Sequence, residues 1–373
     1  MSDRMATPGG SVELRRLPDT GDGPLRAWDA ADELILEHLR ASGVMGERWL
    51  IVNDLFGALA VALAEHRPQS WGDSFTSQQA SAQNLDRNGV GASMVHFVSS
   101  IEVPEAPIDV VVMKVPRSLA LLEDQLRRLR LMLHRDSVIV AGGMVKSIHR
   151  STLEAFESIV GPSPTSLAKK KARLIHPSFD PSLEVGPSPY PSRYELDDGS
   201  PVIEHANVFS RGRLDIGTRA MLDHLPRIED GADVLDLGCG NGLLGLTAAR
   251  RSAVGSLTFV DESYQAIESA RANAKAWSVE VPTRFVVDRT LGGIESSSID
   301  VVLNNPPFHA HQSRGDDTAR SMFADARRVL RPGGQLVVVG NRHLDYHKQL
   351  RRRFGNCDVV GSTPKFVILR AMR

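Results

Sequence analysis

Short apolar runs alternate along the chain with segments of helical periodicity. In the second half, strand-sized runs lie at 233–237, 257–261, 299–303 and 336–339, and a helical segment at 243–251 follows the first of them. Strands that alternate with helices of about 10 to 15 residues are typical of a parallel sheet covered by helices on both faces, with right-handed crossovers. The pattern therefore predicts an α/β fold.

The first half repeats this order of signals with an offset of about 190 residues, which is a domain-length period. The first apolar run enters Leu55-Phe56-Gly57 in the first half and Gly238-Cys239-Gly240-Asn241-Gly242 in the second. A later run enters Met113-Lys114-Val115-Pro116-Arg117 in the first half and Asn304-Asn305-Pro306-Pro307-Phe308 in the second. We therefore predict two tandem Rossmann-like domains related by duplication.

The two copies differ at the positions where a ligand would bind. The first copy has lost its glycines and its Asn-Pro-Pro-Phe sequence, although a run ending at Asp73 matches the run ending at Asp261. A backbone that approaches a ligand closely needs glycine, and we expect Leu55 and Phe56 to fill that space with side chain. The N-terminal copy is thus predicted to be degenerate, to bind no cofactor in the usual place, and to act as a scaffold, a substrate-recognition surface or both.

Prolines between the two copies indicate a linker, because proline fixes φ and removes a backbone donor. They are Pro177, Pro181, Pro187, Pro189, Pro191 and Pro201. We place the degenerate domain at 1–180, a proline-rich linker at 181–200 and the complete domain at 201–373. The length of 373 residues agrees with two domains rather than one core.

Composition narrows the class of protein. Apolar residues make up 42% and charged residues 24%, as in folded globular proteins. No apolar run approaches the roughly 20 residues of a membrane span, and the N-terminal segment lacks the features of a signal peptide, so we expect a cytoplasmic protein. Cys239 and Cys357 stand outside the spacings of a disulfide framework or a zinc site, and no metal is expected.

A glycine-rich turn at the carboxyl end of the first strand is the usual ligand crevice of an open α/β sheet. Here Gly238, Gly240 and Gly242 form that turn, and Asp236 stands just before it. The Asp236 carboxylate can hold the ammonium of a methionine moiety, directly or through water, whereas it would repel a pyrophosphate. The turn therefore favours S-adenosylmethionine over a dinucleotide.

Two further acids complete the predicted cofactor site. Asp261 ends the second strand, where a carboxylate accepts both ribose hydroxyls, a feature that dinucleotide enzymes share. Asp288 follows the run at 284–287 and is placed to accept a hydrogen bond from the adenine amino group. An alternative for Asp236 and Asp288 is that each caps the following turn or helix, and the glycines alone would also suit a structural turn.

Asn305-Pro306-Pro307-Phe308 follows a strand, and so lies at the same carboxyl edge as the glycine turn. An exocyclic amino nitrogen is a poor nucleophile because its lone pair is delocalised into the ring. If the Asn305 side-chain oxygen and the Pro306 carbonyl each accept one N–H, the nitrogen pyramidalises and its lone pair points at a sulfonium methyl. Proline stiffens the turn, and Phe308 offers a face on which a purine stacks. The motif predicts in-line methyl transfer without a metal.

A simpler interpretation of the same motif is a sharp stop after a strand, because asparagine before proline often starts a turn. The histidines that follow, His309 and His311, are expected to face solvent, and the chemistry needs neither.

With these residues the chain resembles class I methyltransferases whose amino-methylating members carry Asn-Pro-Pro-Phe or Asn-Pro-Pro-Tyr. It resembles most the RsmC/RlmG family of bacterial ribosomal RNA guanine-N2 methyltransferases, in which a degenerate N-terminal domain is fused to an active one. The similarity covers nearly the whole chain and favours the large-subunit branch; it is carried by segments 27–33, 56–59, 114–116, 207–210, 214–217, 305–309, 341–346 and 354–357. The resemblance implies that 201–373 is a catalytic domain that uses S-adenosylmethionine to methylate N2 of one guanine in 23S ribosomal RNA, either naked or in a partly assembled large subunit.

Other functions remain as hypotheses. The acceptor in the alternatives is 16S ribosomal RNA, an adenine amino group in DNA or a glutamine amide in a protein. A protein of another class would be a non-catalytic RNA-binding factor in ribosome assembly, but general decay would not spare Asn305 to Phe308 while eroding the first copy. A nicotinamide oxidoreductase is disfavoured by Asp236.

The net charge of −1 argues against coating of nucleic acid by bulk charge, so RNA contacts are expected from local patches. The basic clusters available are Lys169-Lys170-Lys171 with Arg173, Arg127-Arg128 with Arg130, and Arg351-Arg352-Arg353. Each of these also fits a solvated face without a partner. A guanine inside folded RNA must be flipped out to reach Asn305.

Overall fold

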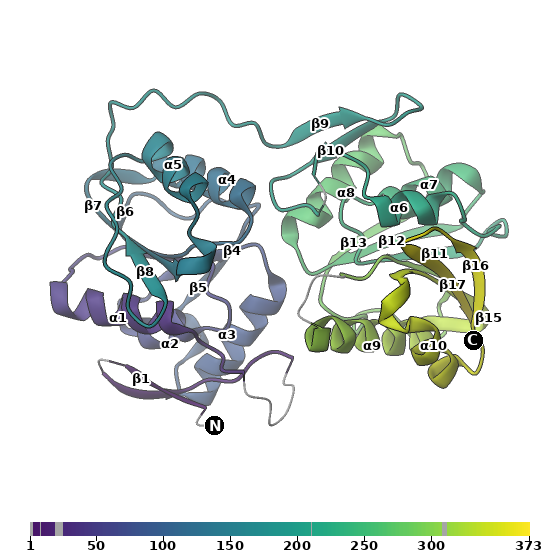
Figure 1. Ribbon diagram of the computed structural model, residues 1–373, viewed down its shortest axis with the longest axis horizontal. Coiled ribbons are helices and arrows are strands. Elements are labelled where there is room, and N and C mark those ends of the chain that lie inside the picture. The colour runs from purple at the N-terminus through teal and green to yellow at the C-terminus, as the bar shows by residue number, and fades with distance from the viewer. Residues whose placement is uncertain (1–2, 8, 19–24, 210, 308–311) are drawn as a thin grey trace. The chain divides into compact units, whose positions relative to one another are not determined.

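The computed structural model describes residues 3–7, 9–18, 25–209, 211–307 and 312–373. The chain forms two compact units, Met1–Tyr190 and Pro191–Arg373, each an α/β sandwich with helices on both faces of a sheet (Figure 1). The predicted α/β class is confirmed.

The second unit is built on a seven-stranded sheet in the order β13-β12-β11-β14-β15-β17-β16. The first five strands in this order are parallel, and β17 runs antiparallel to both of its neighbours. A hairpin of β9 and β10 precedes the sheet. The strands are β9 (Ser192–Glu195), β10 (Pro201–Glu204), β11 (Asp233–Leu237), β12 (Ser256–Asp261), β13 (Thr283–Val287), β14 (Ile299–Asn304), β15 (Leu330–Asn341), β16 (Asp358–Ser362) and β17 (Phe366–Met372). Strand β9 falls inside the segment expected as a linker.

Helices cover both faces of this sheet. They are α6 (Ile216–Leu222), α7 (Leu243–Arg251), α8 (Tyr264–Ala276), α9 (Gln312–Val329) and α10 (Tyr346–Phe354), with a short 3-10 helix η4 (Arg342–Leu344) before α10. Alternate residues of β15 enter two separate cores: Val337 and Val339 pack on the side of α6, α7 and α8, and Leu336 and Val338 on the side of α9 and α10. Figure 1 shows these two layers above and below the sheet.

The first unit has a six-stranded sheet in the order β5-β4-β3-β6-β7-β8, in which only β8 is antiparallel to its neighbour. Its strands are β1 (Arg4–Thr7) and β2 (Gly10–Glu13), which form a separate hairpin, and β3 (Trp49–Val52), β4 (Gln69–Gly72), β5 (His96–Ser99), β6 (Ile108–Lys114), β7 (Leu133–Met144) and β8 (Ala172–Ile175). Its helices are α1 (Ala30–Ser42), α2 (Ala58–Ala62), η1 (Ala64–His66), α3 (Phe75–Arg87), η2 (Ala92–Met94), α4 (Leu119–Arg130), η3 (Val145–Ser147) and α5 (Arg150–Ile159).

The strand registers align the two units residue by residue, and the predicted repeat is confirmed. The last residue of β3 lies beside Met113 of β6, and the last residue of β11 lies beside Asn304 of β14. The residues that come next, Lys114 and Asn305, therefore occupy corresponding positions at the carboxyl edges of the two sheets.

One detail of the repeat is corrected by the register. The pairing of β4 with β3, compared with that of β12 with β11, makes Gly72 the counterpart of Asp261. Asp73 lies one residue further along, is buried, and accepts a hydrogen bond from the Ser100 hydroxyl. A shift of one residue reverses the face to which a side chain points, so the first unit lacks an acid where the second has Asp261.

In the first unit the carboxyl edge carries a buried ion-pair cluster. The Lys114 ammonium lies 2.7 Å from Asp29 Oδ1 and 2.8 Å from Asp32 Oδ1. Asp29 is the N-cap of α1, and Asp32 completes its capping box. Leu55 stands three residues after the end of β3, where the second unit has Gly240, and its side chain is 52% exposed. The Lys114 cluster occupies the strand end that corresponds to Asn305.

Replacing Lys114 with methionine should destabilise the protein by about 3 to 5 kcal/mol, because two carboxylates would lose their buried partner. Unpaired acids escape the penalty by taking up protons, so the loss should be smaller near about pH 5 than near about pH 7. Chemical denaturation at the two pH values measures both effects. The control is Lys170→Met, which removes an exposed ion pair with Glu33 and should cost less than about 1 kcal/mol. Equal losses in the two variants would contradict the prediction.

Candidate active site

The turn after β11 has the backbone of a ligand cradle. Gly238, Gly240 and Gly242 have φ values of +69°, +54° and +82°, a region that favours glycine. A Cβ on Gly242 would lie 2.9 Å from the Cβ of Ala270, so the helix behind it requires glycine there. A Cβ on Gly240 would meet nothing within 4 Å. The space beside Gly240 is therefore open, while the base of the turn is tightly packed.

Three polar side chains hold this turn from different elements. Asp261 Oδ2 accepts a hydrogen bond from the Gly240 N–H at 2.9 Å. The side-chain amide of Asn273 on α8 donates to the Asn241 carbonyl at 2.9 Å. Glu204, at the end of β10, accepts from the Asn241 side chain at 2.9 Å. The turn is thus shaped before any ligand arrives.

Asp236 lies under the turn and is fully buried. Its Oδ2 accepts a hydrogen bond from the Gly245 N–H at 2.9 Å, and its Oδ1 has no partner within the described part of the chain. Burial raises the pKa of Asp236 to about 8, and the nearby Asp261 adds to this, against the Gly245 hydrogen bond. The site therefore holds a buried carboxyl group that gains from a cationic partner.

Asp261 and Asp288 lie at the ends of neighbouring strands, as the sequence predicts. The Asp288 N–H donates to the Asp261 carbonyl at 2.9 Å, which ties the two strand ends together. Asp288 Oδ1 accepts from the Thr290 N–H at 3.0 Å and so caps its own turn. Capping and ligand binding are compatible for a carboxylate, since it has two oxygens.

Asn305 is held at one end of its side-chain amide. Its Nδ2 lies 3.0 Å from Thr218 Oγ1 and 3.3 Å from Asp215 Oδ2. Because a carboxylate only accepts hydrogen bonds, the amide nitrogen must face Asp215. Asn305 Oδ1 is then left buried, without a partner among the described residues. The strand end therefore presents an oriented hydrogen-bond acceptor.

This anchoring repeats the geometry of the first unit with different chemistry. Asp215 is the N-cap of α6, as Asp29 is of α1. In the first unit the corresponding position is Lys114, whose ammonium is paired with two carboxylates. In the second unit Asn305 uses its nitrogen on the cap, and its oxygen has no partner among the described residues.

The rest of the motif is described in part. Pro306 is buried and Pro307 is exposed at the end of β14. Phe308, with His309 and His311, lies outside the described residues.

Several polar residues near these groups were not selected from the sequence. Glu204 is fully buried, burial raises its pKa, and it also accepts from the Gly212 N–H at 2.7 Å. Asn341, at the end of β15, is 9% exposed and its Oδ1 lacks a partner within the described part of the chain. Thr218 had a signal in the sequence, because Asp215 and Thr218 have the spacing of a helix N-cap.

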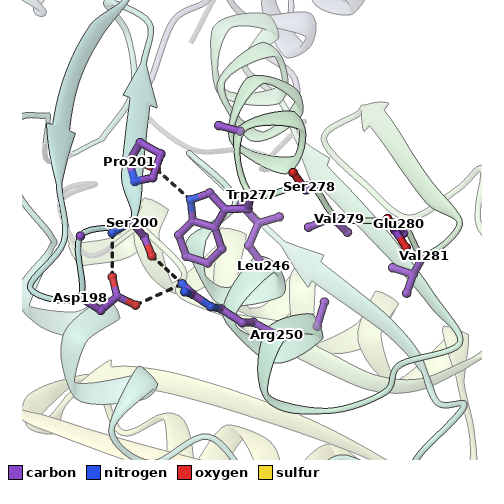
Figure 2. Close-up of a pocket in the computed structure, with 13 residues that line it drawn as sticks. Asp198, Ser200, Pro201, Leu246, Arg250, Trp277, Ser278, Val279, Glu280 and Val281 are labelled. Carbon is purple, nitrogen blue, oxygen red and sulfur yellow. Dashed lines mark hydrogen bonds and ion pairs between the residues drawn. The ribbon is translucent and has the colours of Figure 1, made fainter.

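One cavity lies at the opposite edge of the sheet. It has a volume of about 520 Å³ and lies between the turn of the β9-β10 hairpin and the ends of α7 and α8. Figure 2 shows Arg250 between the Asp198 carboxylate, at 3.1 Å, and the ring of Trp277. The residues that line this cavity do not include Asp236, Asp261, Asp288 or Asn305, so the cavity is separate from the candidate active site.

Within the described ranges, no group of three or more His, Cys, Asp or Glu side chains is arranged to hold a metal ion. No described helix is long and apolar enough to cross a membrane.

The chain matches two family models. Residues 2–181 match the RLMG N-terminal domain, and residues 199–370 match the methyltransferase small domain. Among relatives, it is 50% identical to Ribosomal RNA large subunit methyltransferase G of Streptomyces avermitilis, over 100% of both chains. It is 49% identical to the protein of the same name from Streptomyces coelicolor, over 99% of this chain and 100% of the other.

One solved structure shares the whole architecture. It is the 16S rRNA N2 G1207 methyltransferase (RsmC) of T. thermophilus in complex with AdoMet and guanosine, with a TM-score of 0.76 and 22% identity over 99% of this chain and 97% of that one. The likeness confirms the predicted fold of two tandem class I methyltransferase domains.

Asp236→Asn should flatten the pH dependence of stability. The folded-state pKa of about 8 lies above the ordinary 3.8, so wild-type stability is fully present below about pH 4 and falls as pH rises through about 8. Asparagine keeps an acceptor for the Gly245 N–H and does not ionise. The variant should therefore gain in unfolding midpoint over wild type as pH rises from about 4 to about 9. Calorimetry across this range tests it, and parallel pH profiles would show that Asp236 does not titrate in this way.

Proposed function

Because the chain belongs to the family of ribosomal RNA large subunit methyltransferase G, we propose that it transfers a methyl group from S-adenosylmethionine to the exocyclic N2 amino group of one guanine in 23S ribosomal RNA. The observation that carries the choice of an amino group is Asn305, whose amide nitrogen is anchored and whose buried oxygen has no partner among the described residues. An unpaired buried acceptor costs free energy unless a ligand satisfies it.

The guanine N2 amino group offers the matching donors. Its lone pair is delocalised into the ring while the nitrogen stays planar, so the amine is a weak nucleophile. When Asn305 Oδ1 accepts one N–H, that hydrogen is fixed in space and the nitrogen is favoured to pyramidalise. The stiff turn at Pro306 and Pro307 keeps the acceptor in place during the reaction, which is preorganisation rather than acid or base catalysis. The proton released from the methylated amine leaves to water.

The glycine turn suits S-adenosylmethionine, which supplies an electrophilic methyl group on a sulfonium. The open space beside Gly240 admits a ligand against the backbone. The buried Asp236, with Oδ1 unpaired among the described groups, provides the charge complement of an ammonium. Asp261 is the acceptor for ribose hydroxyls, and Asp288 is the acceptor for the adenine amino group. A dinucleotide fits this set poorly, because its pyrophosphate would face Asp236.

Asp215 and Thr218 act through Asn305 as positioning residues. Asp215 Oδ2 also accepts from the Thr218 N–H at 2.9 Å, so the helix cap and the amide anchor share one carboxylate. Rotating the amide by a half turn would place its oxygen against that carboxylate, which is repulsive. The helix start therefore selects the amide orientation that exposes an acceptor.

We assign the chemistry to a catalytic domain at 201–373, joined by a linker at 181–200 to a degenerate domain at 1–180. In the degenerate domain, Lys114 stands where the catalytic domain has Asn305, and its ammonium, paired with two carboxylates, is not an acceptor for a substrate amine. Its role is that of a scaffold and an RNA-recognition surface. The substrate is 23S RNA, naked or partly assembled, in the cytoplasm.

Asn305→Ala should lower methyl transfer to unmodified 23S RNA by about 10²- to 10³-fold, since it removes a preorganised group that acts on the reacting nitrogen. Binding of S-adenosylmethionine should stay within about twofold of wild type. The measurement is transfer of labelled methyl to 23S and 16S RNA with nucleoside analysis, and N2-methylguanine in 23S RNA alone is expected. Label in 16S RNA, or in N6-methyladenine, would overturn the assigned substrate.

Thr218→Val should lower turnover by about tenfold at saturating RNA while leaving cofactor affinity unchanged, because the amide of Asn305 loses one of its two anchors. Thr218→Ser should restore most of the turnover, since the hydroxyl returns. The matched control is Thr283→Val, whose hydroxyl bonds the Val281 carbonyl at the start of β13. Loss of activity in the control, or none in Thr218→Val, would contradict the positioning role.

A further inference from the structure

Basic charge is concentrated in one segment of this nearly neutral chain. Residues 342–373 contain eight Lys and Arg against two Asp and Glu, although the whole chain has a net charge of −1. The segment covers η4, α10, β16 and β17. The rest of the protein is therefore acidic on balance, and a polyanion would be attracted to this part.

Of the basic clusters in the sequence, the first is neutralised at two of its lysines. Lys169 forms an ion pair with Glu37 at 2.6 Å, and Lys170 forms one with Glu33 at 2.7 Å. Both acids lie on α1 of the same unit. A phosphate would have to displace these carboxylates before it gained the full charge of the lysines.

The second cluster is used inside the first unit. Arg130 donates to the carbonyls of Ile159, Asp180 and Leu183, which fastens the segment after β8. Arg128 donates to the carbonyls of Ser100 and Glu102. These guanidinium groups are held as donors inside the unit, and Arg128 also lies 3.8 Å from Asp124, so fewer of their N–H groups are available to a phosphate.

The third cluster, Arg351-Arg352-Arg353, is exposed and has no side-chain hydrogen bond or ion pair within the described part of the chain. Helix α10 packs through Tyr346, Leu350 and Phe354, so its opposite face lies in solvent. Three adjacent unpaired cations repel one another, and their interaction with the helix C-terminus offsets this only by tenths of a kcal/mol to about 1 kcal/mol each. Stability alone gives little reason for this arrangement.

Two further exposed cations, Arg342 and Lys365, lie at the carboxyl edge of the sheet, at the start of the same helical segment. Strand β15 ends at Asn341 on the carboxyl edge, and the chain passes directly through η4 into α10. Arg342 follows Asn341, and Lys365 precedes Phe366, the antiparallel partner of Asn341 in β17. Both cations are exposed, and Arg342 donates to the Thr363 carbonyl at 2.9 Å. Helix α10 then runs back along the sheet, because Asn356, after its last residue, donates to the Met372 carbonyl beside the start of β15. The basic face therefore extends from the carboxyl edge toward the opposite edge, and Lys348 between them is paired with Asp345.

We propose that this basic face, made of Arg342, Lys365 and the α10 arginines, is the surface that binds the phosphodiester backbone of the ribosomal RNA as it runs from the carboxyl edge along the side of the catalytic domain. The proposal rests on the proposed function, since it needs an RNA substrate. Phosphate contacts carry no sequence information, but they fix the register of an RNA and supply affinity that offsets the unstacking of a flipped base. The lysines at 169–171 and the arginines at 127–130 are not part of this surface.

The test compares two triple variants that remove the same charge. One is Arg351→Gln, Arg352→Gln and Arg353→Gln; the other is Lys169→Gln, Lys170→Gln and Lys171→Gln. Affinity for protein-free 23S RNA is measured at several salt concentrations in the full chain. The α10 variant should bind about tenfold or more weakly near 0.1 M salt, and its plot of log K against log salt should be shallower by about two units, from about 0.7 per phosphate contact. The lysine variant should match wild type.

A third variant separates charge from structure. Replacing the three arginines with lysines keeps the charge and should restore most of the salt slope. Binding of S-adenosylmethionine and turnover at saturating RNA should stay near wild type in all three variants, which keeps this test distinct from that of the proposed function. An unchanged slope in the α10 glutamine variant, or an equal loss in the lysine 169–171 variant, would overturn the proposal.

Discussion

The site depends on the parallel pairing of β11 with β14. Parallel strands bring their carboxyl ends to one edge, so the glycine turn after Leu237 and the motif after Asn304 lie side by side although 67 residues separate them in the chain. The Asn304 side chain donates to the Leu237 carbonyl at 2.7 Å, which fixes the two strand ends to each other. The other contacts of the site, such as Asp261 with the glycine turn and Asp215 with Asn305, hold polar groups in position at this edge.

The same arrangement of a helix cap beside a strand end occurs in both units, but it holds a different residue in each. Both begin a helix with an aspartate cap directed at the end of the fourth strand of the repeat. Where the first unit has Lys114, the ammonium pairs with the carboxylates of Asp29 and Asp32. With Asn305 there, the cap takes the amide nitrogen, and the amide oxygen has no partner within the described part of the chain. The same anchor therefore serves stability in one copy and substrate recognition in the other.

Buried polar atoms without partners in the described part of the chain, and a carboxyl group with a raised pKa, lie near the carboxyl edge of the sheet in the second unit. Asp236 Oδ1 and Asn305 Oδ1 are buried without partners among the described residues, and the pKa of Glu204 is raised by burial. Native proteins pair nearly all buried polar atoms, so such exceptions need an explanation. A cationic cofactor beside Asp236 and an amine beside Asn305 would each remove one of these costs. Leaving these atoms unpaired costs free energy of folding, and a ligand that pairs with them is favoured over one that does not.

The sequence by itself determined the α/β class, the duplication and the grouping of the glycine turn with Asn305, because apolar periodicity and the rule of strand ends need no tertiary detail. It did not determine that Asp73 falls one residue past the position of Asp261, nor that Lys114 pairs with two aspartates at the strand end that corresponds to Asn305. These features follow from strand register and from contacts of Lys114 with residues 29 and 32, which lie far from it in the chain. It also left three basic clusters equivalent. Only the folded chain distinguishes them, because charge available to a partner depends on which acids and carbonyls lie nearby in space.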